Sequence, residues 1–333
     1  MRCRAWFASA DECTELLEAS EGDYTFSQTP RFGAAVARAF SEYTFEPWMF
    51  DFSDGRRVLL PLVRVRRRPS RLRCFEGAPF GLNAAPIVTG GSLDRRHVAA
   101  LFDLLRPDML RINTGATVED PWRSVSEVSE IFEAIQSSSH VLDLEGGMEK
   151  IWGERFTSKV RNQCRSALRK GVEVRQATGA KDFESYYAIY ASATRGWGFA
   201  SPPYPPNLFR ELAGLLGRGV ELKLAFFAGQ AIAGILLLHG RWSTLYWGAA
   251  MLKEFGSYSP HNALLRTAIE DACQRRMKQF DFGSSGPLES VREFKESFGA
   301  RPSGYWNYSL MSGRYRLLAR VKSLCSRAAG WVS

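Results

Sequence analysis

The sequence lacks the features that mark several protein classes. Its six cysteines contain no C-x-x-C pair, and neither they nor the four histidines have the spacing of metal ligands. Scattered cysteines of this kind are typical of reduced thiols in the cytosol. No solenoid repeat and no low-complexity tract is present either. We therefore expect a cytoplasmic protein that binds no metal.

Long hydrophobic runs are also missing. The N-terminus, MRCRAWFASADEC, has no apolar core of the kind that a secretory signal needs. The most apolar segment, LAFFAGQAIAGILLLH, has 16 residues and is interrupted by Gly229 and Gln230. That length is short for a membrane span, and the interruption indicates two strands around a turn. We therefore expect no transmembrane segment.

Basic residues, in contrast, are in surplus. The 333 residues carry a net charge of +9, and 45% of them are hydrophobic. The length suggests two domains or one large one. The positive charge favours acidic partners such as nucleic acid, anionic lipid or phosphorylated substrates. A basic surface without such a partner is an equal alternative.

The first half, residues 1–140, alternates helical and extended patterns. RFGAAVARAFSEY predicts a helix that begins near Pro30, and the β-prone runs around a Ser-Asp-Gly turn at 53–55 predict a hairpin. Between positions 56 and 73 the chain has eight arginines and no acid. SLDRRHVAALFDLLRP predicts a further helix with Ser92 as its cap.

The second half begins near residue 141 and includes a strongly basic helix. FTSKVRNQCRSALRKG predicts a helix that ends at Gly171. Its predicted buried stripe consists of every fourth residue, Phe156, Val160, Cys164 and Leu168. Arg161 and Arg165 lie beside this stripe. Their face of the helix is either solvated or binds phosphates of an acceptor.

A regular order of elements follows. ELKLAFFA, AIAGILLLH and STLYWGAAM predict three antiparallel strands joined by short turns. The loop LKEFGSY leads to Ser259 and Pro260, a helix cap followed by proline at the first helical position. HNALLRTAIEDACQRRM then predicts a helix and QFDFG a strand. A short helix containing Phe294 and Lys295 and a last strand, YWNYSL, complete the order.

This order of three strands, loop, helix, strand, helix and strand is similar to the core of the GNAT acyltransferase fold. In that fold, the backbone N–H groups of the loop and of the helix N-terminus receive the phosphates of the donor. The resemblance assigns this role to the loop residues Lys253, Gly256, Ser257 and Tyr258. The loop keeps only the central glycine and a basic residue of the usual pattern, so it departs from ordinary acetyl-CoA binding.

The segment from YWGAAM to FKESFGA resembles the Fem-type branch of this superfamily. That branch includes peptidoglycan-bridge aminoacyltransferases and relatives with a BioF2- or CelD-like acetyltransferase domain, and its members show an Asp-Phe/Leu-Gly turn followed by Phe/Tyr-Lys-x-x-Phe-Gly. FTSKVRNQCRSALRKGVEV and LLPLVRVRRR with APFGLNAAPI extend the resemblance over most of the chain. It implies an α/β (α+β) fold of two tandem GNAT-like domains, residues 1–140 and 141–311, each a mixed, mostly antiparallel sheet flanked by helices.

The resemblance also implies an enzyme that transfers an acyl or aminoacyl group to an amine. Its donor would be an acyl-CoA or other acyl thioester, or an aminoacyl-tRNA. Its acceptor would be a small-molecule or lipid-linked amine on a cell-envelope or polysaccharide precursor, such as one for peptidoglycan or exopolysaccharide. This chemistry needs a stabilised oxyanion and a bound anionic leaving group, and a lysine suits both tasks. We therefore expect Lys295 to contact the donor, with Phe294 packing beside it, although a surface lysine is the alternative.

Three further residues are candidates for the site. Tyr246 matches a substrate-contacting tyrosine of the family, or it is a core residue. Asp281 orients Lys295 or the amine, or it only caps its turn. His239 ends a strand and is either a general base or a structural histidine.

The C-terminal segment, residues 312–333, has a pattern of its own. From Arg314 to Arg327 it has five basic residues and no acid, and its apolar residues form one helical face. A basic amphipathic helix can lie on an anionic membrane surface, pack on its own domain or line a tRNA groove. The sequence thus predicts a cytosolic GNAT-fold N-acyltransferase that can contact the inner face of the membrane. Two non-catalytic alternatives are a nucleic-acid-binding protein and a membrane-surface scaffold.

Overall fold

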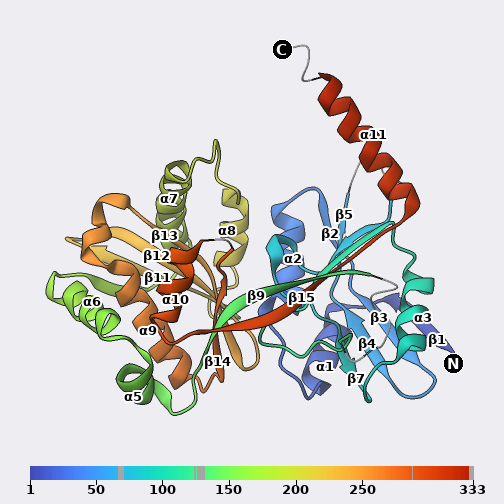
Figure 1. The fold of residues 1–333 in the computed structure, drawn as a ribbon, viewed down its shortest axis with the longest axis horizontal. Helices are drawn as coiled ribbons and strands as arrows, with labels where there is room; N and C mark the ends of the chain where they lie inside the picture. The colour runs from blue at the N-terminus through green and yellow to red at the C-terminus, as the bar shows by residue number, and fades with distance from the viewer. Residues whose placement is uncertain (67–70, 124, 126–131, 287, 330–333) are drawn as a thin grey trace.

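The computed structural model describes residues 1–66, 71–123, 125, 132–286 and 288–329, with side chains up to residue 321. Two halves lie side by side and are joined by two long strands, β9 (Glu133–Asp143) and β15 (Arg301–Met311) (Figure 1). These strands pair antiparallel along most of their length. The predicted boundary at residue 140 falls inside β9, and we retain it as a proposal.

Among its described residues, the N-terminal half contains a four-stranded antiparallel sheet and three longer helices. The sheet has the order β1-β3-β4-β7, with β1 (Cys3–Phe7), β3 (Trp48–Phe52), β4 (Arg57–Leu60) and β7 (Ile87–Thr89). The helices are α1 (Ala10–Ala19), α2 (Pro30–Ala39) and α3 (Arg95–Leu105), with the short turns η1 (Phe26–Gln28) and η2 (Pro79–Gly81). The predicted hairpin and the helix at Pro30 are confirmed. The cap predicted at Ser92 is wrong, because the Asp94 carboxylate accepts from the first N–H groups of α3.

The C-terminal half contains the predicted meander. Its strands are β10 (Glu173–Gln176), β11 (Val220–Phe227), β12 (Gln230–His239), β13 (Ser243–Met251) and β14 (Gln279–Ser284). Its helices are α5 (Gly147–Lys150), η3 (Ile151–Arg155), α6 (Ser158–Arg169), α7 (Ala180–Gly196), α8 (Pro206–Ala213), η4 (Lys253–Tyr258), α9 (Pro260–Gln274) and α10 (Glu289–Glu296). A last helix, α11 (Gly313–Ala329), follows β15.

Both halves contribute to one continuous sheet. Its order is β10-β11-β12-β13-β14-β9-β15-β8-β6-β5-β2, with β2 (Tyr43–Phe45), β5 (Val63–Val65), β6 (Cys74–Glu76) and β8 (Met109–Asn113) from the N-terminal half. The continuity arises because β15 pairs with β9 and also with β8. The predicted mixed, mostly antiparallel α/β fold is confirmed, with shared strands joining the two halves.

Two apolar cores lie on opposite faces of the C-terminal part of this sheet. One lies under α7 and α8 and extends to α2, and the other lies under α6 and α9. Phe156, Val160 and Cys164 are buried as predicted, but Leu168 is 50% exposed and Ala167 is buried instead. Steps of four residues overshoot a helical turn of 3.6 residues, so the fourth position rotates away from the core.

The strands β13 and β14 diverge inside the sheet. They are parallel neighbours over only three residue pairs, Ser243–Leu245 with Gln279–Asp281. Beyond these pairs β13 continues to Met251 and β14 to Ser284 without pairing with each other. Such an opening leaves room between the two strands, and backbone groups that are not hydrogen-bonded across it. It positions the site described below.

No helix within the described ranges is long and apolar enough to cross a membrane. The five cysteines with described side chains form no disulfide with one another.

Candidate functional site

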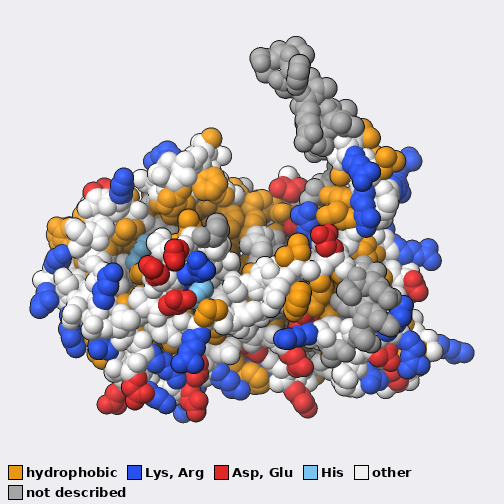
Figure 2. Space-filling model, viewed as in Figure 1, with side chains coloured by type: hydrophobic (Ala, Val, Ile, Leu, Met, Phe, Trp, Pro, Cys, Tyr) orange, Lys and Arg blue, Asp and Glu red, His pale blue; other side chains and the backbone are white. Residues whose placement is uncertain are grey.

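A cavity of about 720 Å³ lies where β13 and β14 diverge and extends to the N-terminal half. From the C-terminal half it is lined by Tyr246, His261, Asp281 and Lys295 among others. Figure 2 shows hydrophobic side chains gathered along the hollow between the two halves, below α7 and α8. The cavity therefore brings three of the predicted site residues together.

Lys295 comes from α10 and is buried, with 4% of its surface exposed. Its Nζ donates hydrogen bonds to the carbonyl oxygens of Gly283 (2.7 Å) and Ser284 (2.9 Å). Burial lowers the pKa of this lysine to about 8, against the opposing effect of Asp281. Two of its three N–H groups hold the end of β14, which leaves one for a group in the cavity. Lys295 is thus not a surface lysine.

Asp281 lies on β14, at the point where the strands diverge. Its Oδ1 accepts hydrogen bonds from the N–H of Gly283 (2.7 Å) and from the hydroxyl of Ser139. Burial raises the pKa of Asp281, although these bonds and the charge of Lys295 act in the opposite direction. The side chain therefore caps its turn and also lines the cavity beside Lys295.

Tyr246 and His261 line the same opening. The ring of Tyr246 on β13 lies 6.1 Å from that of Phe282 on β14. His261, at the start of α9, has its Nε2 3.4 Å from the carbonyl oxygen of Ala250, and burial lowers its pKa. Sequence reasoning missed His261 because isolated histidines have no ligand-like spacing. Its position directly after Pro260, at a helix N-terminus, was the available signal.

The turn between β14 and α10 rests on a second histidine that sequence reasoning also missed. His140 is 1% exposed, with its Nδ1 3.1 Å from the hydroxyl of Ser285 and its Nε2 3.3 Å from a carboxylate oxygen of Glu296. Phe294 packs behind this turn, with its ring 5.2 Å from that of Phe298. These contacts fix the segment that carries Lys295.

His239 lies outside the cavity. Its ring nitrogens are 3.0 Å from the hydroxyl of Thr244 and 3.2 Å from a carboxylate oxygen of Glu221. Glu221 is 2% exposed and also pairs with Lys223 (2.8 Å) and with Arg275. This buried ionic network holds the imidazole under α9. The structure therefore does not bring His239 together with Lys295.

Arg161 and Arg165 do not line the cavity either. One Arg161 nitrogen donates to three carbonyl oxygens, those of Trp152 (3.1 Å), Gly153 (3.2 Å) and Phe156 (2.6 Å). The exposed Arg165 lies over the Trp152 ring at 5.5 Å. Arg161 thus closes the end of η3, where backbone acceptors have no helical partners.

The two arginines give a testable contrast. We expect Arg161→Met to lower the free energy of unfolding by about 1–3 kcal/mol, because three carbonyl groups lose a charged donor. Arg165→Met, at an exposed position, should cost less than about 1 kcal/mol. Urea unfolding followed by circular dichroism measures both. Equal losses for the two variants would contradict the structural role of Arg161.

The predicted donor loop forms the short helix η4. Lys170 donates to the carbonyl oxygen of Ser257 at 2.7 Å and lies 5.6 Å from the centre of the Tyr258 ring. Lys253 and Gly256 are exposed at its outer side. Ser259 and Pro260 occupy the predicted N-cap and first helical positions of α9, but Ser259 has a φ of 54° and its side chain makes no capping hydrogen bond. In the first turn of α9, Pro260 has no N–H, and the N–H groups of Asn262 and Ala263 donate to the carbonyl oxygen of Ser259 at 3.1 and 3.4 Å.

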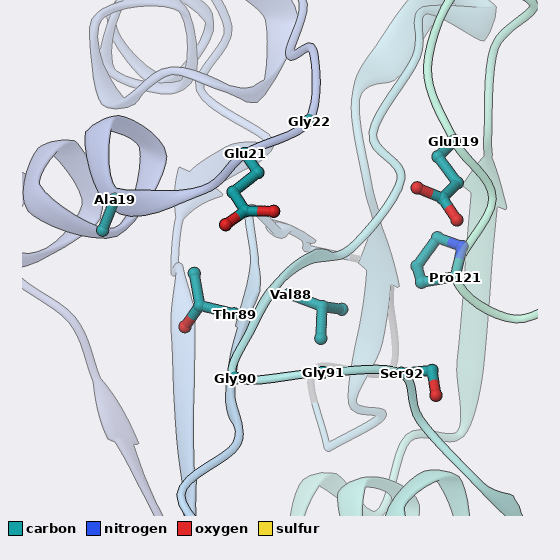
Figure 3. A pocket seen from close by; sticks show the side chains of 10 residues that line it. All are labelled: Ala19, Glu21, Gly22, Val88, Thr89, Gly90, Gly91, Ser92, Glu119 and Pro121. Carbon is teal, nitrogen blue, oxygen red and sulfur yellow. The ribbon is translucent and has the colours of Figure 1, made fainter.

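A second hollow, of about 410 Å³, lies in the N-terminal half (Figure 3). Glu21 and Glu119 point into it from opposite sides, above the backbone of Gly90 and Gly91. Both glutamates are exposed, and the described lining has no lysine, histidine or cysteine. We therefore place the chemistry in the larger cavity.

Comparison with known proteins gives a family for part of the chain and a fold for nearly all of it. Residues 155–296 match the model of the family described as Acetyltransferase (GNAT) domain. No curated protein matches the chain in sequence.

Several solved structures share the fold. FemX is similar with a TM-score of 0.67 at 10% identity, covering 91% of this chain and 96% of FemX. A tandem GNAT protein from the clavulanic acid biosynthesis pathway has a TM-score of 0.58 at 12% identity, covering 92% and 98%. The C-terminal domain of a putative lysylphosphatidylglycerol synthetase from Agrobacterium fabrum has a TM-score of 0.56 at 10% identity, covering 95% of each chain. At these identities the likeness shows the fold, which is the predicted tandem GNAT arrangement.

Proposed function

We propose that this chain, whose residues 155–296 belong to the GNAT acetyltransferase domain family, transfers an acyl or aminoacyl group to an amine in the cavity between its halves. The fold supports acyl transfer in general. The observation that carries the proposal is the buried Lys295 beside Asp281, at the point where β13 and β14 diverge.

The donor is an acyl thioester or an aminoacyl-tRNA, and the acceptor is an amine on a cell-envelope or polysaccharide precursor. The tandem GNAT protein is described as a form without AcCoA, which links this fold to a thioester donor. The lysylphosphatidylglycerol synthetases that share the fold are named for an aminoacylated lipid, which supports an envelope acceptor. Lys253, Gly256 and Ser257 are exposed and lie just before the N-terminus of α9, where phosphates of either donor would bind.

In the proposed reaction, the acceptor ammonium first gives a proton to the free oxygen of Asp281. The neutral amine then attacks the acyl carbonyl carbon, and a C–N bond forms while the carbonyl oxygen takes up negative charge. The remaining N–H of Lys295 donates to this oxygen, and a cation in a water-poor site stabilises it strongly. The tetrahedral intermediate collapses when the C–S or C–O bond to the leaving group breaks. The leaving group takes a remaining amine proton.

Donor binding tests this proposal. Acetyl-CoA, a long-chain acyl-CoA and charged tRNA are screened by thermal shift and then by calorimetry against wild type, Lys295→Ala and the exposed control Lys181→Ala. We expect one donor to bind Lys295→Ala about tenfold or more weakly, because a hydrogen bond from a charged group is lost. Lys181→Ala should bind like wild type. If no donor binds, or if Lys295→Ala binds as tightly as wild type, the non-catalytic alternatives take precedence.

The helix α11 suits contact with a membrane surface, a second role beside catalysis. It projects away from the rest of the molecule (Figure 1), and Tyr315 and Leu318 at its base pack against the N-terminal half. Leu317 and Val321 are 63% and 48% exposed, and arginines lie beside them. We propose that this helix contacts an anionic membrane surface, which attracts basic amphipathic helices. The predicted apolar positions Leu324, Cys325 and Ala328 lie outside the described side chains.

Vesicle binding tests the role of α11. We expect the double variant Leu317→Glu, Val321→Glu to lose about fivefold or more of its co-sedimentation with phosphatidylglycerol vesicles, because charge replaces its apolar contact. Leu104→Glu, at an exposed leucine on α3, should bind like wild type. Binding that is equal for all three proteins, or equal on neutral vesicles, would contradict the membrane contact.

A further inference from the structure

The cavity is nearly free of charge, although the chain has 44 lysines and arginines. Apart from Lys295 and Asp281, no described lining residue carries a full charge at neutral pH, since burial lowers the pKa of His261. The N-terminal half contributes neutral hydrogen-bonding side chains instead, including Asn83 and Asn113. A phosphate or carboxylate here would lose its hydration without gaining a cation. This end of the cavity therefore fits an uncharged polar ligand.

Asn83 offers an unused donor at this end. The residue is 7% exposed, and its Oδ1 accepts a hydrogen bond from the N–H of Ala85 at 2.9 Å. Its Nδ2 is buried and has no partner among the described residues. A Cβ at Gly115 would lie 2.6 Å from Cγ of Asn83, so this glycine provides the room for the amide. A buried N–H without a partner is costly. Because Nδ2 has almost no accessible surface, a ligand hydroxyl would satisfy it when the amide turns toward the cavity.

Aromatic rings line the cavity as well. The ring of Tyr204 lies 4.9 Å from that of Phe80 and 5.4 Å from that of Trp247. Phe80, in the turn η2, has a φ of 69°, a conformation that bulky residues rarely adopt and that costs backbone strain. Trp197 also lines the cavity and is 58% exposed. An exposed indole face is a platform for an apolar surface of a ligand.

We propose that the acceptor is an amino sugar. A pyranose presents apolar C–H faces, which pack on aromatic rings, and a rim of neutral hydroxyl groups, which pair with amide side chains. Trp197 and Asn83 supply these two kinds of contact, while the sugar's amine reaches Asp281. This assignment rests on the proposed function, because it names the acceptor of the same cavity.

Direct binding tests the assignment. The β-1,4-linked dimer of glucosamine is compared by calorimetry with cyclohexylamine and glycylglycine, two amines without a sugar. Trp197→Ala is matched by Phe199→Ala, an aromatic residue of the same loop that is 49% exposed and does not line the cavity. Asn83→Ala is matched by the exposed Asn207→Ala. Thermal unfolding of each variant verifies that it is folded.

We expect the glucosamine dimer to bind wild type about tenfold or more tightly than either other amine. Trp197→Ala and Asn83→Ala should each weaken it several-fold, and the two controls should stay within about twofold of wild type. The assignment is overturned if the dimer binds no tighter than cyclohexylamine, if glycylglycine binds best, or if Trp197→Ala behaves like Phe199→Ala. Should the dimer fail while a donor binds in a Lys295-dependent manner, the sugar assignment is wrong and the proposed function stands. Should both fail, both are wrong.

Discussion

Lys295→Met is expected to lower kcat/KM for acyl transfer by about 10²–10³-fold, the effect of removing one oxyanion donor. The lysine is the only cation among the described cavity residues whose charge is full at neutral pH, so no neighbour replaces it. Methionine has a similar length and suits a buried position, but it leaves the carbonyl oxygens of Gly283 and Ser284 without this donor, so thermal unfolding verifies that the variant is folded. The rate is measured with the donor that the binding screen identifies, and Lys181→Met serves as the exposed control. A loss of less than about threefold in kcat/KM would contradict the claim that Lys295 stabilises the transition state.

The same lysine should shape the pH dependence of the reaction. Its pKa is lowered to about 8, so the protonated fraction falls as the pH rises through that value. We expect kcat/KM to decline on the alkaline side for wild type and not for Lys295→Met. Titration of the acceptor amine acts in the opposite direction, because a higher pH increases its reactive neutral form. An alkaline decline that persists in the variant would contradict this assignment.

Asp281→Asn is the second variant with a large expected effect, a loss of about 10²–10⁴-fold in kcat/KM, the usual contribution of a general base. Burial raises the pKa of Asp281. Because protonation removes the base, we expect kcat/KM of wild type to fall on the acid side at a pH above the ordinary pKa range of aspartate. The asparagine keeps an oxygen for the N–H of Gly283, so the turn should survive. Asp103→Asn, at an exposed position, is the matched control. The role of Asp281 would be contradicted if Asp281→Asn left kcat/KM unchanged, or if the remaining kcat/KM of this variant still fell at the same acid pH as that of wild type.

Local patterns predicted most of the C-terminal half, because they are short-range. The meander of β11, β12 and β13 follows from β-prone runs around short turns, and α9 from its helical periodicity and Pro260. The prediction that Lys295 and Asp281 lie at one site came from the resemblance to a family, since spacing alone allowed a surface lysine. The burial of Lys295 and the partial burial of Asp281 are properties of the folded chain.

The remaining features depend on contacts between distant parts of the chain. The continuous sheet requires Ser309 of β15 to lie opposite Glu133 of β9, a pairing that no local pattern indicates. Asn83 and Trp197 belong to loops in different halves, and only the fold brings them to one cavity. His239 has the chemistry of a base, but the ionic network around Glu221 occupies it. Such competition for partners cannot be read from a residue's type.

A structure with a non-reactive analogue of the identified donor tests the central claim most directly. We predict that the acyl group lies between the diverging ends of β13 and β14, with its carbonyl oxygen within hydrogen-bonding distance of Nζ of Lys295 and its carbon facing Asp281. Binding of the analogue in the hollow beside Glu21 and Glu119, or on the outer surface with Lys295 bonded only to Gly283 and Ser284, would contradict the account.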